Sequence, residues 1–172
     1  MNTNTKLNSS SVVVVSGGGR GITSECIIYL ARQYKCRFIL LGRSALAAEP
    51  EWSIACVDES ELKKRIMQHL IEQKEKPTPI KVQNIYKKIC QSREIYQTLA
   101  DIKEGGGEAE YLSVDVTDAS ALKSALAPVA GRLGNITGII HGAGNLADKL
   151  IENKTEQDFE TVYNVKIEGL HS

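Results

Sequence analysis

The glycine cluster at residues 16–21, Ser-Gly-Gly-Gly-Arg-Gly, is the part of the sequence best suited to bind a ligand. It follows a run of four valines and precedes a segment with helical periodicity. Glycines let a backbone turn tightly and approach a pyrophosphate closely, and the N–H groups at a helix start attract phosphate. We therefore expect a dinucleotide to bind here, through Ser16, Gly17, Gly19, Arg20, Gly21 and Ile22; the alternative is a glycine turn without a ligand.

One residue departs from this pattern. Thr23 occupies a position where a third glycine is often found. A glycine there allows the helix to pack closely on the sheet. The threonine hydroxyl can instead bond the helix backbone, and its bulk predicts a helix that lies slightly farther from the strand.

The residues after the second apolar run indicate which dinucleotide binds. That run, residues 37–41, is followed by Gly42, Arg43 and Ser44. An acidic residue at this place would bind the ribose hydroxyls of NAD. A guanidinium can bind a 2′-phosphate bidentately and stack on adenine, and the Ser44 hydroxyl adds a hydrogen bond. The sequence therefore predicts NADP(H) rather than NAD, the alternative being a solvated arginine at a strand end.

Two further strand ends should lie at the same edge of the sheet. Asp115 either accepts a hydrogen bond from the adenine amino group or forms a turn, and these alternatives are equally open. His141 is either a functional residue or a packed residue at the end of its strand, and the glycines after it form a second turn beside the cofactor. The expected cofactor contacts in these segments are Asp115, Val116, His141, Gly142, Ala143 and Gly144.

The elements that must position these residues alternate between strands and helices. Short, fully apolar, β-branched runs are typical of parallel strands, which are buried on both faces. The predicted strands are 12–15, 37–41, 109–116 and 136–141, and the predicted helices are 21–34, 61–76, 80–104, one capped by Asp118 and one beginning at Thr155. This order predicts an α/β fold, a Rossmann-like parallel sheet with helices on both faces, truncated after about four strands.

By composition, the chain divides into a lead-in and a domain that contains an insertion. Residues 1–10 are polar and are expected to form a linker or disordered lead-in, and residues 11–172 a partial nucleotide-binding domain. Residues 44–79 are rich in proline and charge, and we interpret them as an insertion with its own helix. The expected buried faces are Ile22, Cys26, Ile27, Leu30 and Ala31 on the first helix, and Ile85, Ile89, Tyr96, Leu99 and Ile102 on the long one.

Composition argues against several classes of partner. The 21 basic and 21 acidic residues cancel, so nothing favours nucleic acid or an anionic membrane. No apolar run approaches the roughly 20 residues of a membrane helix, and the N-terminus lacks an apolar signal stretch. The four cysteines show no metal-ligand spacing. We expect a cytoplasmic protein without a metal site.

Taken together, the motifs resemble the short-chain dehydrogenase/reductase superfamily, and more narrowly the ketoreductase domain of type I polyketide and polyunsaturated-fatty-acid synthases. The matching segments are 16–23, 40–44, 111–118, 138–144, 146–149 and 159–170. The insertion around 77–79 and 92–95 looks like the fatty-acid-synthase branch. The resemblance covers nearly all of the chain after residue 10.

The resemblance implies a reaction and its participants. In such domains NADPH delivers hydride to the 3-keto group of an acyl chain held on an acyl carrier protein. Lys166 matches the lysine that bonds the ribose and lowers the pKa of a catalytic tyrosine; without the resemblance it would be taken as a helix-surface lysine. Asp148 matches the aspartate associated with the D-configured alcohol, although Ala147 replaces the second aspartate of the fuller motif.

Relatives continue with a strand bearing a serine and a helix bearing a tyrosine, beyond the last residue here. Tyr163 precedes Lys166 by three residues, and we do not assign it the tyrosine's role. We therefore expect the NADP(H)-binding part of a 3-oxoacyl reductase, inactive by itself and completed by the missing half and by other synthase domains. Two alternatives remain: a non-catalytic, ketoreductase-like half-domain, and another reductase or epimerase acting on a free small molecule.

Overall fold

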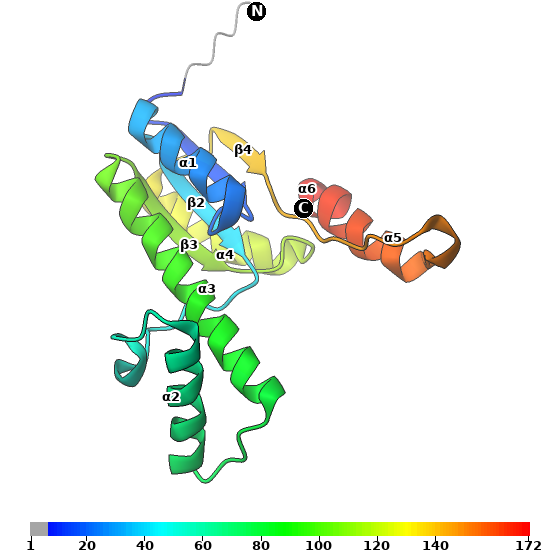
Figure 1. Ribbon diagram of the computed structural model, residues 1–172. Coiled ribbons are helices and arrows are strands. Elements are labelled where there is room, and N and C mark those ends of the chain that lie inside the picture. The colour runs from blue at the N-terminus through cyan, green and yellow to red at the C-terminus, as the bar shows by residue number, and fades with distance from the viewer. Residues whose placement is uncertain (1–6) are drawn as a thin grey trace, which may run out of the picture. The chain divides into compact units, whose positions relative to one another are not determined.

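The computed structural model describes residues 7–172, and Figure 1 shows the arrangement of its elements. The chain forms two compact units: residues 7–43 with 97–172, and residues 44–96. The first unit holds the strands β1 (Val12–Ser16), β2 (Arg37–Gly42), β3 (Glu108–Ser113) and β4 (Gly138–His141). Its helices include α1 (Gly21–Tyr34), α4 (Ala119–Leu133) and α5 (Glu156–Tyr163).

The four strands form one parallel sheet in the order β3-β2-β1-β4. This is the strand order of a Rossmann sheet, and it confirms the predicted fold class. Strands are added in one direction from β1 to β3, and the direction of addition reverses when β4 is placed on the other side of β1. A ligand crevice lies at such a reversal, outside the carboxyl ends of the strands. The glycine turns after β1 and β4 are therefore neighbours at the edge where ligands bind.

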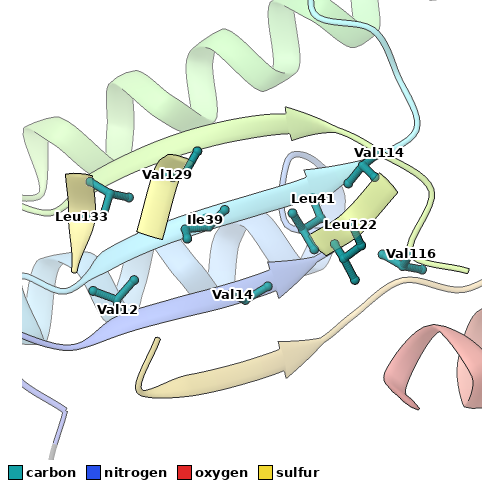
Figure 2. Packing of buried hydrophobic residues seen from close by; sticks show 9 residues of the cluster. All are labelled: Val12, Val14, Ile39, Leu41, Val114, Val116, Leu122, Val129 and Leu133. Atoms are coloured by element: carbon teal, nitrogen blue, oxygen red, sulfur yellow. The ribbon is translucent and has the colours of Figure 1, made fainter. Parts of the chain in front are cut away.

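Each face of the sheet has its own core. On one face, Val12, Val14, Ile39 and Leu41 pack against α4, and Figure 2 shows their side chains with those of Leu122, Val129 and Leu133. On the other face, Val13, Val15, Phe38 and Leu40 pack against α1 through Ile27, Ile28 and Ala31. Alternate residues of the same strand serve opposite faces, so every position of β1 is buried.

The second unit is a helical hairpin with a small core. It contains the 3₁₀ turn η1 (Glu51–Ser53), the helix α2 (Glu59–Glu72), which is capped by Asp58, and the first part of α3 (Pro79–Glu104). Its core consists of Cys56, Leu62, Ile66, Leu70, Val82 and Ile89. The Arg93 guanidinium crosslinks the loop before α2 by donating to a Glu49 carboxylate oxygen and to the carbonyls of Ser53 and Cys56.

Some predicted buried positions are wrong. Ile22 is 86% exposed and Cys26 is also exposed, because α1 buries a row through Ser24, Ile27, Ile28 and Ala31. On α3, Tyr96 is exposed while the adjacent Ile95 is fully buried. The other predicted positions hold: Ile27, Ala31, Ile89 and Ile102 are buried, and Leu30, Ile85 and Leu99 are partly buried.

The two ends of the described chain complete the fold. Residues 1–6 of the predicted lead-in lie outside the described residues; Leu7 packs against the core that includes α1, and Asn8 accepts hydrogen bonds from Ser10 in a turn. Within residues 7–172, no helix is long and apolar enough to cross a membrane. The C-terminal segment contains the 3₁₀ turn η2 (Ile151–Asn153), α5, the π-helical turn η3 (Asn164–Glu168) and the short α6 (Gly169–His171).

Candidate cofactor-binding site

The turn after β1 is held between the neighbouring strands. The Gly17 N–H donates to the Leu41 carbonyl at 2.8 Å. Gly17 has a φ of +68°, and a Cβ there would lie 2.9 Å from the Ala143 nitrogen. Both the conformation and the close approach therefore require glycine at this position. They bring the turn after β1 directly against the turn after β4.

The start of α1 is open. Gly21 has a φ of +67°, and no described atom lies within 4 Å of where its Cβ would be. The first turn of α1 carries no acidic residue, and the N-cap, Arg20, makes no side-chain hydrogen bond to the helix N–H groups. Thr98 anchors the turn from behind by donating to the Gly19 carbonyl at 3.0 Å. A free helix N-terminus in open space can hold a phosphate.

Thr23 points toward the second glycine turn. A Cβ on Gly142 would lie 2.5 Å from Thr23 Oγ1 and 2.7 Å from its Cγ2. The sequence predicted a bond from the Thr23 hydroxyl to the helix backbone and a helix displaced from the sheet. In the structure the Thr23 side chain occupies space left by the absence of a side chain at residue 142, and the distance of the helix from the sheet stays a prediction.

His141 is tied into the fold on both sides of its ring. Its Nε2 lies 3.0 Å from the Val165 carbonyl oxygen, and its Nδ1 lies 2.8 Å from Ser16 Oγ. A carbonyl only accepts, so Nε2 carries a proton and donates to it, and in the tautomer with its proton on Nε2 the ring accepts from the Ser16 hydroxyl at Nδ1. Ser16 Oγ in turn accepts from the Ala143 N–H at 3.1 Å. His141 is thus packed at the end of its strand, with both ring nitrogens in contact with neighbouring segments.

Arg43 lies just beyond β2 with its side chain exposed. Its Nη2 donates to Asn145 Oδ1 at 2.9 Å, and Asn145 Nδ2 donates to the Thr161 carbonyl at 3.2 Å. Ser44 belongs to the second unit, where its hydroxyl donates to Gln91 Oε1 at 3.1 Å. A Cβ on Gly42 would lie 2.6 Å from the Tyr111 hydroxyl oxygen, so a side chain at residue 42 would displace the end of Tyr111.

Asp115 and Val116 were predicted to end the third strand, and this is wrong. The strand β3 stops at Ser113, and both residues lie in the following loop. Asp115 Oδ1 accepts from the Thr117 N–H at 3.0 Å and from its hydroxyl at 2.8 Å. These bonds, above all the one from the backbone, hold the pKa of Asp115 below its ordinary value, and the charge of Arg43 adds to the effect. Asp115 is therefore a turn-forming residue that remains ionised close to Arg43.

Lys166 lies in the π-helical turn η3, a local irregularity that is frequent at functional sites. A Cβ on Gly144 would lie 3.0 Å from Lys166 Cε and 3.3 Å from its Nζ, so the end of the side chain rests against the second glycine turn. Asp148 is exposed in the irregular segment before η2. Within residues 7–172, no hydrogen bond or ion pair connects it to Lys166.

Two contacts of the site were not predicted. Asn145 bonds Arg43, and Thr98 bonds the glycine turn across a separation of 79 residues. Asn145 had one signal in the sequence, since it is a polar residue directly after a glycine turn. Thr98 had none, because a threonine on a helix looks like any other.

Comparison with known proteins identifies the family. Residues 11–172 match the KR domain. One subunit of a polyunsaturated fatty acid synthase from Thraustochytrium is 35% identical over 97% of this chain, which spans 6% of that protein. An N-terminal ketoreductase from a macrolactin assembly line has the same fold, with a TM-score of 0.62 and 24% identity over 95% of this chain and 24% of its own.

A further solved structure has the same fold. Carveol dehydrogenase from Mycobacterium avium, solved in complex with NAD, aligns with a TM-score of 0.60 and 18% identity over 94% of this chain and 46% of its own. The fold and the glycine turns thus define a Rossmann-like parallel α/β unit. This chain belongs to the KR domain family, whose members here are parts of multidomain polyketide and polyunsaturated-fatty-acid synthases.

Proposed function

We propose that this chain is the NADP(H)-binding part of a 3-oxoacyl reductase domain in a polyketide or polyunsaturated-fatty-acid synthase. The observation that carries the proposal is the meeting of three features at one edge of the sheet. The open helix start at Gly21 lies beside the turn after β1, Arg43 lies beyond β2, and Lys166 rests on the turn after β4. These positions suit a pyrophosphate, a 2′-phosphate and a ribose, respectively. Along the strand order β2-β1-β4 the pyrophosphate position lies between the other two, as it does in the dinucleotide.

In this arrangement each residue has a distinct task. The N–H groups at the start of α1 bind the pyrophosphate, and the exposed Ile22 side chain covers it from solvent. Arg43 binds the 2′-phosphate, and its hydrogen bond to Asn145 breaks when it does. The Lys166 ammonium donates to the ribose and stabilises the ionised form of the tyrosine supplied with the rest of the domain. The bound nicotinamide supplies hydride to the 3-keto group.

The proposal extends to the substrate and partners, by analogy with the family. The acyl chain would be presented as a thioester on an acyl carrier protein, and Asp148 would bias the product toward the D-configured alcohol. Other domains of the synthase would pack against this one, in the cytoplasm. The relative with 35% identity is a synthase subunit, and this chain spans only 6% of its length, which supports such an assembly.

Titration with NADPH and with NADH tests the cofactor. We expect the parent protein to bind NADPH more tightly than NADH. Arg43→Ala should weaken NADPH binding about ten- to a hundredfold, the value of hydrogen bonds to a charged group, and leave NADH binding nearly unchanged. Arg32→Ala, at the far end of α1, is the charge-matched control. Equal affinities for both dinucleotides in the parent would overturn the 2′-phosphate assignment.

Turnover tests the reaction. The full-length protein that carries this chain should oxidise NADPH with a 3-ketoacyl thioester, and Lys166→Ala should reduce that rate. Activity on free small molecules alone would favour a reductase or epimerase of another substrate class. Binding of neither dinucleotide, together with stable docking to a second domain, would favour the non-catalytic half-domain.

A further inference from the structure

We propose that His141 is a positioning residue that fixes Lys166 at the cofactor site. The use of Lys166 in cofactor binding rests on the proposed function, whereas the contacts between His141 and the segment that carries Lys166 do not. The strand-end histidine reaches across to the C-terminal segment and holds the peptide unit directly before the lysine. Through Ser16 it is bonded at the same time to both glycine turns.

The first step in the argument is the bond between His141 and Val165. Nε2 lies 3.0 Å from the Val165 carbonyl oxygen, and that carbonyl belongs to the peptide unit that joins Val165 to Lys166. Fixing this peptide unit fixes the direction in which the Lys166 side chain leaves the backbone. The turn η3 is π-helical here, and a regular α-helix would present residues 165 and 166 at different angles.

The second step is the restraint on the histidine ring itself. Ser16 Oγ donates to Nδ1 at 2.8 Å and accepts from the Ala143 N–H at 3.1 Å. Every polar atom in this chain of bonds has a partner of the right kind when the ring is neutral with its proton on Nε2. The ring therefore has one tautomer and one orientation, set by the turns that bind the dinucleotide.

The third step is where the lysine lies as a result. Its Cε and Nζ lie 3.0 and 3.3 Å from the position that a Cβ on Gly144 would occupy. On the other side, Gly169 approaches Val116 and the His141 ring, with its Cβ position 2.7 Å from Val116 Cγ2 and 3.6 Å from His141 Cε1. The segment carrying Lys166 is thus seated on His141, and its lysine is delivered to the second glycine turn.

Two conservative variants separate positioning from a general contribution to the fold. The amide of glutamine reaches the place of Nε2, so His141→Gln keeps a donor for the Val165 carbonyl. The amide of asparagine reaches only the place of Nδ1, so His141→Asn keeps the Ser16 contact and loses Val165. A merely structural role would make the two variants alike or favour asparagine.

The first measurement uses the cofactor-free protein labelled with ¹⁵N-lysine. The Lys166 amide resonance is identified by its loss in Lys166→Ala. We expect His141→Asn to move this resonance and His141→Gln to leave it near the parental position. An unmoved resonance in a folded His141→Asn protein would overturn the proposal whether or not NADPH binds.

The second measurement is the affinity for NADPH. His141→Asn should weaken binding about fivefold, the value of one hydrogen bond, while His141→Gln should stay within about twofold of the parent. In the Lys166→Ala background, the two variants should bind NADPH equally. The same loss in both backgrounds would show that His141 does not act through Lys166. If Lys166→Ala itself binds NADPH like the parent, the ribose contact of the proposed function fails, while the resonance of Lys166 still decides the positioning.

Discussion

Thr23 of the first glycine turn lies in the space that a side chain on Gly142 of the second would fill. A Cβ at residue 142 would lie 2.5 Å from Thr23 Oγ1, and 3.0 Å from the Ser16 carbonyl oxygen. Many nucleotide-binding turns carry a glycine at the position of Thr23. Here the space for the larger residue at 23 comes from Gly142, at the end of the neighbouring strand β4. The two turns are therefore complementary as a pair, and neither can be assessed alone.

This complementarity predicts a coupled effect on stability. Gly142→Ala should lower the free energy of unfolding by about 1 to 3 kcal/mol, the range for overpacking a tight site. Thr23→Ala removes both threonine atoms that the new methyl group would meet, so the double variant should recover most of that loss. Urea unfolding of the four proteins measures the coupling. An equal cost of Gly142→Ala with and without Thr23 would contradict the relationship.

The bond between Arg43 and Asn145 predicts competition with the cofactor. Arg43 Nη2 donates to Asn145 Oδ1 at 2.9 Å in an exposed position, and a 2′-phosphate would take over that donor. Asn145→Ala should therefore tighten NADPH binding about two- to threefold, as expected for one exposed hydrogen bond. Calorimetric titration checks this, and Asn145→Ala should have no effect once Arg43 is alanine. Weaker binding would mean instead that Asn145 holds Arg43 in its binding position.

Two glycines with open surroundings should respond in opposite ways to alanine. Gly21→Ala forces a side chain into the left-handed region, at a cost of about 1 to 2 kcal/mol, and fills the space before α1. It should lower both stability and NADPH affinity. Gly131, inside α4, also has no atom near its Cβ position, so Gly131→Ala should raise stability by up to about 1 kcal/mol and leave NADPH binding unchanged. Thermal unfolding and titration of both variants provide the comparison.

The ion pair between Arg93 and Glu49 predicts how the second unit responds to acid. The hydrogen bond from Arg93 holds the pKa of Glu49 below its ordinary value. Stabilisation by a lowered carboxyl pKa is complete above the unfolded value of about 4.3 and disappears as the pH falls through the folded value. Glu49→Gln should therefore cost about 1 to 2 kcal/mol at pH 7 and progressively less below about pH 4.

Trp52, the only tryptophan, belongs to the second unit and stacks on His69, so its fluorescence during urea unfolding reports on this unit. Glu25→Gln, on the exposed side of α1, is a control for the loss of one carboxylate. A cost of Glu49→Gln that stays constant from pH 7 to pH 3 would contradict the prediction.

The sequence by itself determined the order of strands and helices and the places where the chain must turn. The apolar, β-branched runs of β1 and β2 are typical of strands buried on both faces. The glycines after β1 and β4 mark the places where these strands end and the chain turns. The bounds of α1 and the caps at Asp118 and Thr155 were predicted correctly, because capping depends on residues close in sequence. Arg43 was placed beyond β2 for the same local reason.

Only the tertiary structure decided which of these residues meet. The buried side of α1 and α3 depends on the direction from which the sheet approaches, so the sequence placed Ile22 and Tyr96 inside wrongly. Asp115 forms a turn with Thr117, and the fold places its carboxylate near Arg43, which follows a different strand. His141 meets partners 125 and 24 residues away, Ser16 and Val165. The first contact is set by the pairing of β1 with β4 and the second by the packing of η3 against the strand end, which no local pattern encodes.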